Sequence, residues 1–138
     1  MEAADFKKTE RGRPFRREPD WVRPSASPPV VFDRPALLER VMDDEELAGA
    51  VIAGFLGDIP GQIETLQRFL DVSDARGAER QAHLLKGAAA TVGGEALRAT
   101  AFAMEQAGRT GDLASVATGM DELGRQFLRL KEAMTKQG

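Results

Sequence analysis

The sequence predicts an all-α fold: an antiparallel up-down four-helix bundle with a short additional N-terminal helix. Alanine, leucine, glutamate and arginine are plentiful, and these residues favour helix. Apolar residues recur at spacings of three and four in four long segments, and no segment alternates apolar and polar residues over the length of a strand. Short turns join the four segments, so neighbouring helices must run antiparallel.

Composition and charge exclude several classes of protein. The 138 residues suit one domain with a modest core. The absence of cysteine excludes disulfides and thiolate metal sites, and a single histidine excludes a metal site built from several histidines of one chain. A net charge of -3 argues against dedicated nucleic-acid binding. With no run of about 18 apolar residues and no signal-peptide core, we expect a soluble cytoplasmic protein without membrane insertion.

Residues 1–28 differ from the rest, and we predict a flexible N-terminal arm or linker there, followed by a helical domain over 29–138. The arm shows no hydrophobic period and holds four of the seven prolines, with Pro29 directly after it. Seven basic and five acidic residues give the arm a net charge of +2, which leaves -5 on the domain. A basic arm suits an acidic partner, but a solvated tether is the simpler interpretation. Trp21 can pack back onto the domain.

Two helices are predicted first. Asp33 is a good N-cap for a short helix over about 34–41. A long helix over about 45–72 follows, in which Pro60 removes one backbone donor and should cause a kink, with two separate helices broken there as the alternative. The inward stripe of the long helix comprises Leu47, Val51, Phe55, Ile59, Ile63, Leu66 and Leu70.

Three further helices complete the bundle. The third begins after Asp74 and ends at Gly93-Gly94, where glycine can take the left-handed conformation. The fourth covers about 95–107 and the fifth about 113–136. Their inward positions are Ala78, Ala82, Leu85, Ala89 and Val92 in the third, Leu97, Ala101 and Met104 in the fourth, and Val116, Met120, Leu123, Phe127, Leu130 and Met134 in the fifth.

The third helix carries the only histidine, His83, with Lys86 three residues and Gly87 four residues later. At about 100° per residue, His83 lies about 140° from the buried seam, with Lys86 about 60° to one side and Gly87 about 40° to the other. An exposed mid-helix glycine costs about 1 kcal/mol relative to alanine, and close approach of a partner is one reason to keep it. The layout suits a nucleophile that another protein must reach, although a lone exposed histidine more often has no function.

The run Ala82-His83-Leu84-Leu85-Lys86-Gly87-Ala88-Ala89-Ala90-Thr91-Val92-Gly93-Gly94 resembles the signature of the histidine-containing phosphotransfer (HPt) domain. That signature reads roughly A-H-x-L-K-G, then three small residues, and further on an apolar residue and a glycine. The resemblance includes the Phe55-Leu56-x-x-Ile59-Pro60 pattern and the turn at 106–112, and it spans about residues 31–136.

The resemblance implies that His83 accepts a phosphoryl group from the phospho-aspartate of a response-regulator receiver domain and passes it to another receiver. It implies that Lys86 neutralises charge on the phosphoryl oxygens and that Gly87 lets the receiver approach the ring. The chain itself would bind no metal and no cofactor, since the receiver supplies Mg²⁺. The candidate partner-binding residues are Arg76, Glu79, Arg80 and Ala90, although for the three charged ones a solvated rim is the simpler interpretation.

Three interpretations stay open at this point. The first is a phosphorelay phosphocarrier without an ATP site of its own and therefore not an enzyme, expected to be a monomer, either free-standing or part of a hybrid sensor kinase. The second is the phosphoacceptor domain of a chemotaxis-type histidine kinase, which would require the chain to be a fragment. The third is a helical adaptor that binds a receiver without carrying phosphate, against which the intact His-x-x-Lys-Gly argues.

Overall fold

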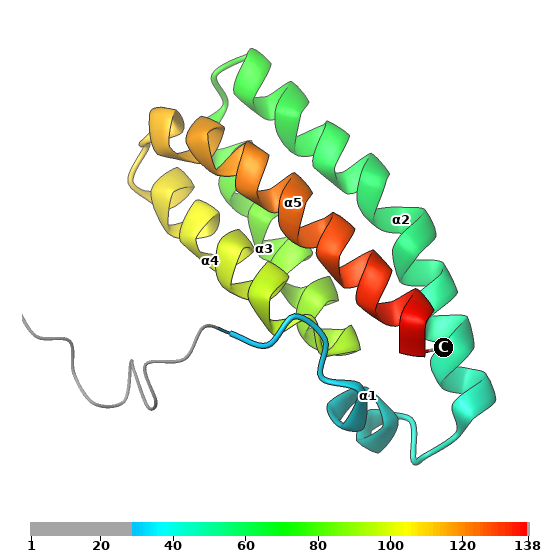
Figure 1. Ribbon diagram of the computed structural model, residues 1–138. Coiled ribbons are helices and arrows are strands. Elements are labelled where there is room, and N and C mark those ends of the chain that lie inside the picture. Colours follow the sequence, from blue (N-terminus) through cyan, green and yellow to red (C-terminus); the bar gives the residue numbers. More distant parts are fainter. Residues whose placement is uncertain (1–28, 138) are drawn as a thin grey trace, which may run out of the picture.

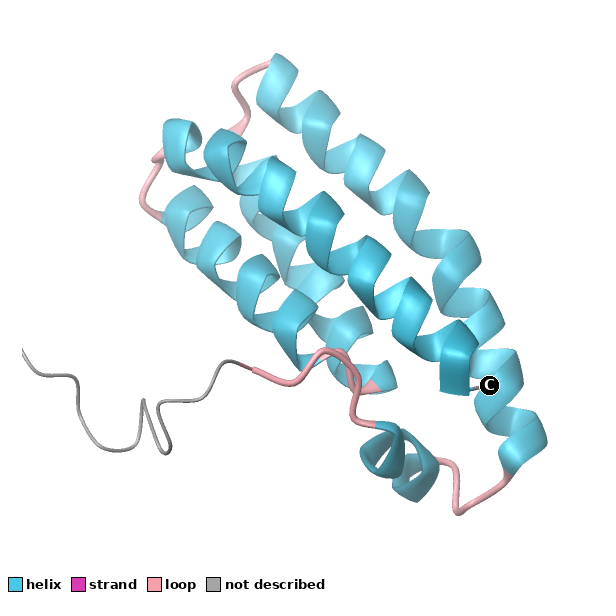
Figure 2. Ribbon diagram, viewed as in Figure 1, coloured by secondary structure: helices cyan, strands magenta, loops and turns pink. Residues whose placement is uncertain are grey.

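The computed structural model describes residues 29–137, and this part of the chain contains five helices and no strand (Figures 1 and 2). The predicted arm, with Trp21, lies outside the described residues. The all-α prediction is confirmed. The helices are α1 (Arg34–Arg40), α2 (Glu45–Asp71), α3 (Ala75–Val92), α4 (Glu95–Arg109) and α5 (Leu113–Gln137).

Helices α2 to α5 form the predicted antiparallel four-helix bundle, and the short α1 lies at one end of it (Figure 1). In the bundle, α3 packs against α2 and α4, while α5 packs against α4 and α2. The ring of four helices is thereby closed, and α1 contacts α2 and α3. Within residues 29–137, no helix combines the length and the apolar character that crossing a membrane requires.

Capping residues set the helix boundaries. The side chains of Asp33, Asp44 and Asp74 each accept a hydrogen bond from the backbone N–H three residues further along, at the starts of α1, α2 and α3. Helix α3 ends at Gly93, whose φ of 80° is left-handed as predicted. A Cβ there would lie 2.5 Å from the carbonyl oxygen of Asp33, and the N–H of Asp33 donates to the Gly93 carbonyl at 2.7 Å. The segment before α1 is therefore fastened to the end of α3.

One expectation about α2 is confirmed and one is wrong. The predicted long helix runs unbroken through Pro60, so the alternative of two separate helices does not apply. Leu47, predicted to face inward, is 47% exposed, whereas the neighbouring Ala48 is buried. The buried residues of α2 are Ala48, Phe55, Ile59 and Leu66, spaced by seven, four and seven. Leu47 lies one residue, or about 100°, away from that stripe.

The fourth helix continues to Arg109 instead of ending near Ala107. Gly108 lies inside the helix and allows close packing with α3, since a Cβ there would meet the backbone of Glu79 at 3.0 Å. The left-handed turn is made further on by Gly111, with φ 79°. The extension places Arg109 on the last turn of a regular helix, beside α3.

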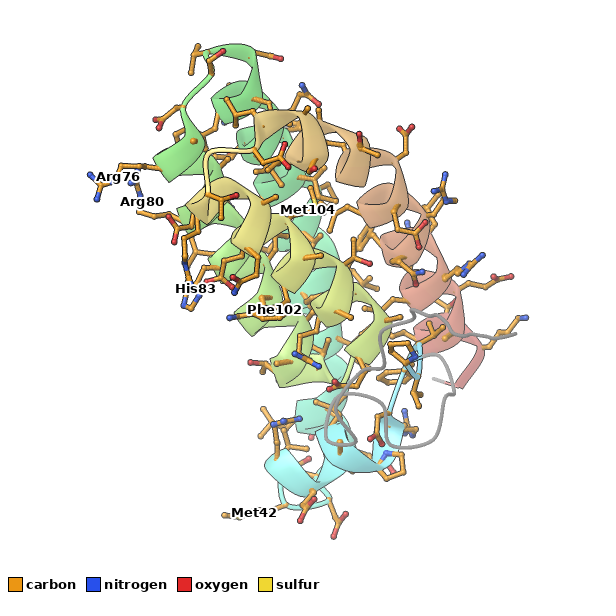
Figure 3. The ribbon with its side chains drawn as sticks, turned by 90° about the vertical axis from the view of Figure 1, so that its left-hand side faces the viewer. Met42, Arg76, Arg80, His83, Phe102 and Met104 are labelled. Atoms are coloured by element: carbon orange, nitrogen blue, oxygen red, sulfur yellow. The ribbon has the colours of Figure 1, made fainter. Side chains whose placement is uncertain are left out.

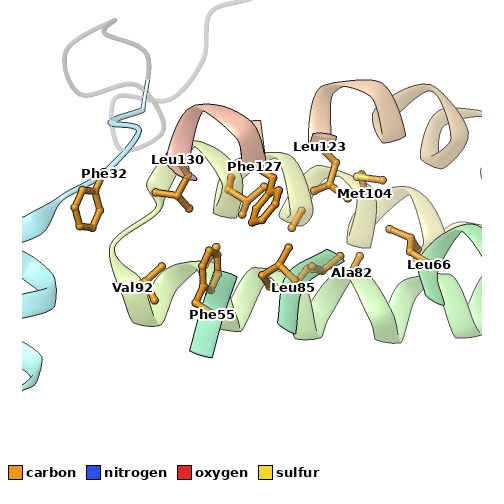
Figure 4. Packing of buried hydrophobic residues seen from close by; sticks show 14 of the residues in the cluster. Phe32, Phe55, Leu66, Ala82, Leu85, Val92, Met104, Leu123, Phe127 and Leu130 are labelled. Atoms are coloured by element: carbon orange, nitrogen blue, oxygen red, sulfur yellow. The ribbon is translucent and has the colours of Figure 1, made fainter. Parts of the chain in front are cut away.

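The predicted seams of α3 and α4 form the core, and every residue assigned to them is buried. On α3 most of these side chains are alanines, which lets the neighbouring helices approach closely. Phe55 of α2 and Phe127 of α5 pack with ring centroids 6.3 Å apart, in the same layer as Leu85 of α3 (Figure 4). The buried seam fixes the rotation of α3 about its axis, and this determines which residues of α3 face outward.

Candidate functional site

His83 projects from the exposed side of α3, as the helical phase predicts. Its side chain is 62% exposed, while Ala82 and Leu85 on the same helix are fully buried. Figure 3 shows the ring at the surface, with Arg76 and Arg80 on one side along α3 and Phe102 of α4 on the other. The imidazole is therefore open to a partner, and the backbone that carries it is held by the core.

The carboxylate of Glu105 on α4 lies next to the imidazole ring. Nδ1 of His83 is 2.9 Å from Oε2 of Glu105, whose side chain is only 5% exposed. An ionised carboxylate only accepts hydrogen bonds, so Nδ1 is the donor. In the neutral ring the proton on Nδ1 leaves the lone pair on Nε2, and this contact therefore selects the tautomer with a nucleophilic Nε2.

Two cations compensate the charge of the buried carboxylate. The Lys86 ammonium Nζ lies 2.7 Å from Oε1 of Glu105, and Nη2 of Arg109 lies 3.6 Å from Oε2. Arg109 is held from the other side by Glu79, whose Oε2 accepts from the arginine Nε at 3.1 Å. Glu105 thus joins His83 and Lys86 of α3 to Arg109 on its own helix, α4.

The ionisation of Glu105 follows from these contacts. Burial raises the pKa of this carboxyl and is the largest single influence, but hydrogen bonds from Lys86 and His83, together with their charges, outweigh it. The net effect lowers the pKa of Glu105 below its ordinary value of 4.5. The group is therefore an anion at neutral pH, and it accepts the hydrogen bond from the N–H of His83.

Gly87 lies one turn beyond His83 with open space above it. It is exposed, and a Cβ built there would meet no atom within 4 Å. Packing among residues 29–137 therefore gives no reason for a glycine, although helix propensity disfavours it by about 1 kcal/mol relative to alanine. The surroundings are partly apolar, because Leu84 is 58% and Phe102 43% exposed. Such a face suits contact with another protein.

The other candidate residues from the sequence have different surroundings. Glu79 belongs to the site through its ion pair with Arg109. Arg76 and Arg80 are exposed on α3 and form no ion pair within residues 29–137, although Arg80 lines a hollow that also includes His83 and Glu105. Ala90 is half-buried, two turns from the histidine along α3.

Sequence reasoning missed three residues of α4: Phe102, Glu105 and Arg109. They are spaced by three and four, so they share one face of the helix. Phe102 supports the network, since the Lys86 ammonium lies 5.2 Å from the centroid of its ring. One signal was available: Glu105 comes four residues after the inward-facing Ala101, which puts a carboxylate on the buried stripe.

A family model described as Hpt domain matches residues 50–135, more than half of the chain. Among solved structures, the crystal structure of histidine-containing phosphotransfer protein B (HptB) from Pseudomonas aeruginosa PAO1 is similar, with a TM-score of 0.72. The sequence identity is 20%, and the similarity covers 78% of this chain and 93% of that chain. At this identity the structural likeness speaks for the fold alone. No curated protein matches.

Proposed function

Because the chain belongs to the Hpt domain family, we propose that it is a phosphocarrier of a two-component phosphorelay, in which His83 accepts a phosphoryl group from a receiver aspartate and passes it to another receiver. The observation that carries the proposal is the contact between Nδ1 of His83 and the buried carboxylate of Glu105 at 2.9 Å. This contact leaves Nε2 as the nucleophile on an exposed ring.

The transfer balances without an additional acid or base. The Nε2 lone pair forms a bond to phosphorus while the bond from phosphorus to the aspartyl oxygen breaks, and the receiver carboxylate leaves with the electron pair. Nδ1 keeps its proton, so the imidazole ring of the phosphorylated histidine carries a positive charge. Glu105 supplies the opposite charge next to that cation, and onward transfer reverses the same steps on a second receiver.

Two cationic side chains near His83 can neutralise the negative charge of the phosphoryl group. Lys86 has three donors on its ammonium, of which the contact with Glu105 uses one, and its side chain is 25% exposed. We assign it the stabilisation of the phosphoryl oxygens. Arg109 is 56% exposed on the other side of the carboxylate and can add a second positive charge. Phosphoryl transfer depends mainly on such positioning and charge neutralisation.

The receiver would provide the rest of the reaction site. We propose that it brings the Mg²⁺ ion and its acidic pocket, so that this chain acts as a phosphocarrier without a cofactor of its own and not as a kinase. The face around His83 is where the receiver would bind, with Gly87 and Ala90 allowing close approach and Arg76, Glu79 and Arg80 at its edge. We expect such a carrier to act as a monomer in the cytoplasm.

A two-stage transfer experiment tests this function. Receivers of the source cell are first phosphorylated with a small acyl phosphate, desalted, and mixed with the full chain and Mg²⁺. We expect at least one receiver to transfer an acid-labile, base-stable phosphate to the chain. Adding a second, unphosphorylated receiver should then remove that phosphate from the chain. If no receiver gives or takes the phosphate, or if the chain is labelled only by an ATP-binding kinase domain, the phosphorelay assignment is wrong.

A further inference from the structure

A groove between α4 and α5 lies apart from the hollow at His83 and shares no lining residue with it. Small side chains form much of its wall, among them Ala99 and Ala103 of α4 and Gly119 of α5. Pro29, the first described residue, lies at the same groove. The groove is thus an apolar surface directly beside the point where residues 1–28 join the domain.

One polar group in this groove lacks a partner. Gln126 is only 9% exposed, and its Nε2 donates to Oε2 of Glu122 at 2.6 Å. Its Oε1 is buried and accepts no hydrogen bond from any described residue. An unsatisfied buried acceptor costs about 1–3 kcal/mol. This oxygen is closed off from the groove surface, so an occupant that complements the groove needs an apolar body above all.

Trp21 has this chemistry and lies within reach. The indole is a large apolar group whose only polar function is an N–H donor. Trp21 precedes Pro29 by eight residues in a proline-containing stretch, and at about 3.1 Å per residue an extended chain of that length spans about 25 Å. The α4 wall of the groove, from Ala96 to Ala107, is about 16 Å long at 1.5 Å per residue. Any position along the groove is therefore accessible to the indole.

We propose that the groove between α4 and α5 is the docking site of the chain's own N-terminal arm, with the Trp21 indole against the small side chains. Attachment at Pro29 makes the encounter intramolecular, which raises the effective concentration of the indole at the groove. The net charge of +2 on residues 1–28 and of -5 on the remainder favours the same contact. The docked arm would cover α4 on the side away from His83.

Fluorescence of the full chain tests the proposal directly, because Trp21 is the only tryptophan and there is no tyrosine. We expect emission at shorter wavelength than that of a peptide of residues 1–28, and quenching by acrylamide that is several-fold weaker. Ala103→Glu places a charge on the exposed groove wall and should shift both values to those of the peptide. The matched control is Ala53→Glu, at an exposed position of α2, which should change neither value.

The folding of each variant is checked by circular dichroism, and Ala99→Glu replaces Ala103→Glu if the latter loses helicity. Peptide-like emission from the unmodified chain would overturn the proposal. So would protected emission that neither groove substitution alters, because Trp21 would then be buried elsewhere. Protection that disappears on dilution would assign the groove to the arm of a second copy and would contradict the intramolecular contact.

Discussion

Replacing His83 with glutamine is expected to abolish phosphoryl transfer to the chain while the bundle stays folded. The substitution removes Nε2, the atom that we propose as the nucleophile. It retains an amide that can donate to Glu105, so the buried carboxylate keeps Lys86, Arg109 and a neutral donor. Because the side chain is 62% exposed, the free energy of unfolding should change by no more than about 0.5 kcal/mol. Labelling from a phosphorylated receiver and urea denaturation measure the two quantities.

The contrast between the two measurements is what makes this variant decisive. An unfolded variant would also fail to accept phosphate, so the denaturation midpoint has to be shown to match that of the unmodified chain. Acid-labile label on a folded His83→Gln variant would mean that another group accepts the phosphate. The chain has no second histidine, so the assignment of the site would then fail altogether.

The second large effect is expected from Gly87→Glu, which should slow transfer from the receiver by at least about tenfold, or 1.4 kcal/mol of transition-state free energy. The glutamate side chain would fill the open space beside the ring and bring a negative charge toward the transferring phosphoryl group. The fold has room for it, because a Cβ at this position meets nothing within 4 Å. Initial rates of transfer at several receiver concentrations provide the measurement.

Gly57→Glu is the matched control for that experiment. Gly57 is likewise an exposed glycine in the middle of a helix, with nothing within 4 Å of a built Cβ, but it lies on α2. Both variants should be as stable as the unmodified chain or slightly more so, since glycine is the poorer helix former. Equal transfer rates in the two variants would remove the role of Gly87 in close approach.

The architecture could be predicted because helical periodicity alone determines it. The four-three spacing of the α3 seam identified every buried apolar residue of that helix, and it also turned His83 outward. The error fell where this signal is weak: the exposed Leu47 lies at the first turn of α2, where few neighbours constrain the phase. Helix α2 continues through Pro60 as predicted, because packing along a long helix can outweigh one missing hydrogen bond.

The site could be predicted only in part, because a sequence motif describes one helix while this site is shared by two. His83, Lys86 and Gly87 were visible within five residues of α3. Their partner Glu105 lies on α4, and its role depends on how the two helices face each other. Lys86 illustrates the difference: its sequence position suggests a free cation for phosphate, and the structure shows it in an ion pair with Glu105.

The position of the phosphoryl group on the imidazole tests the central claim most directly. The chain, labelled with ¹⁵N in histidine, is phosphorylated by a receiver, and the two ring nitrogens are distinguished by long-range proton–nitrogen correlation spectra. The hydrogen bond from Nδ1 to Glu105 predicts phosphorus on Nε2 of His83, with Nδ1 still protonated. Phosphorus on Nδ1, or phosphate on any other residue, would contradict the account.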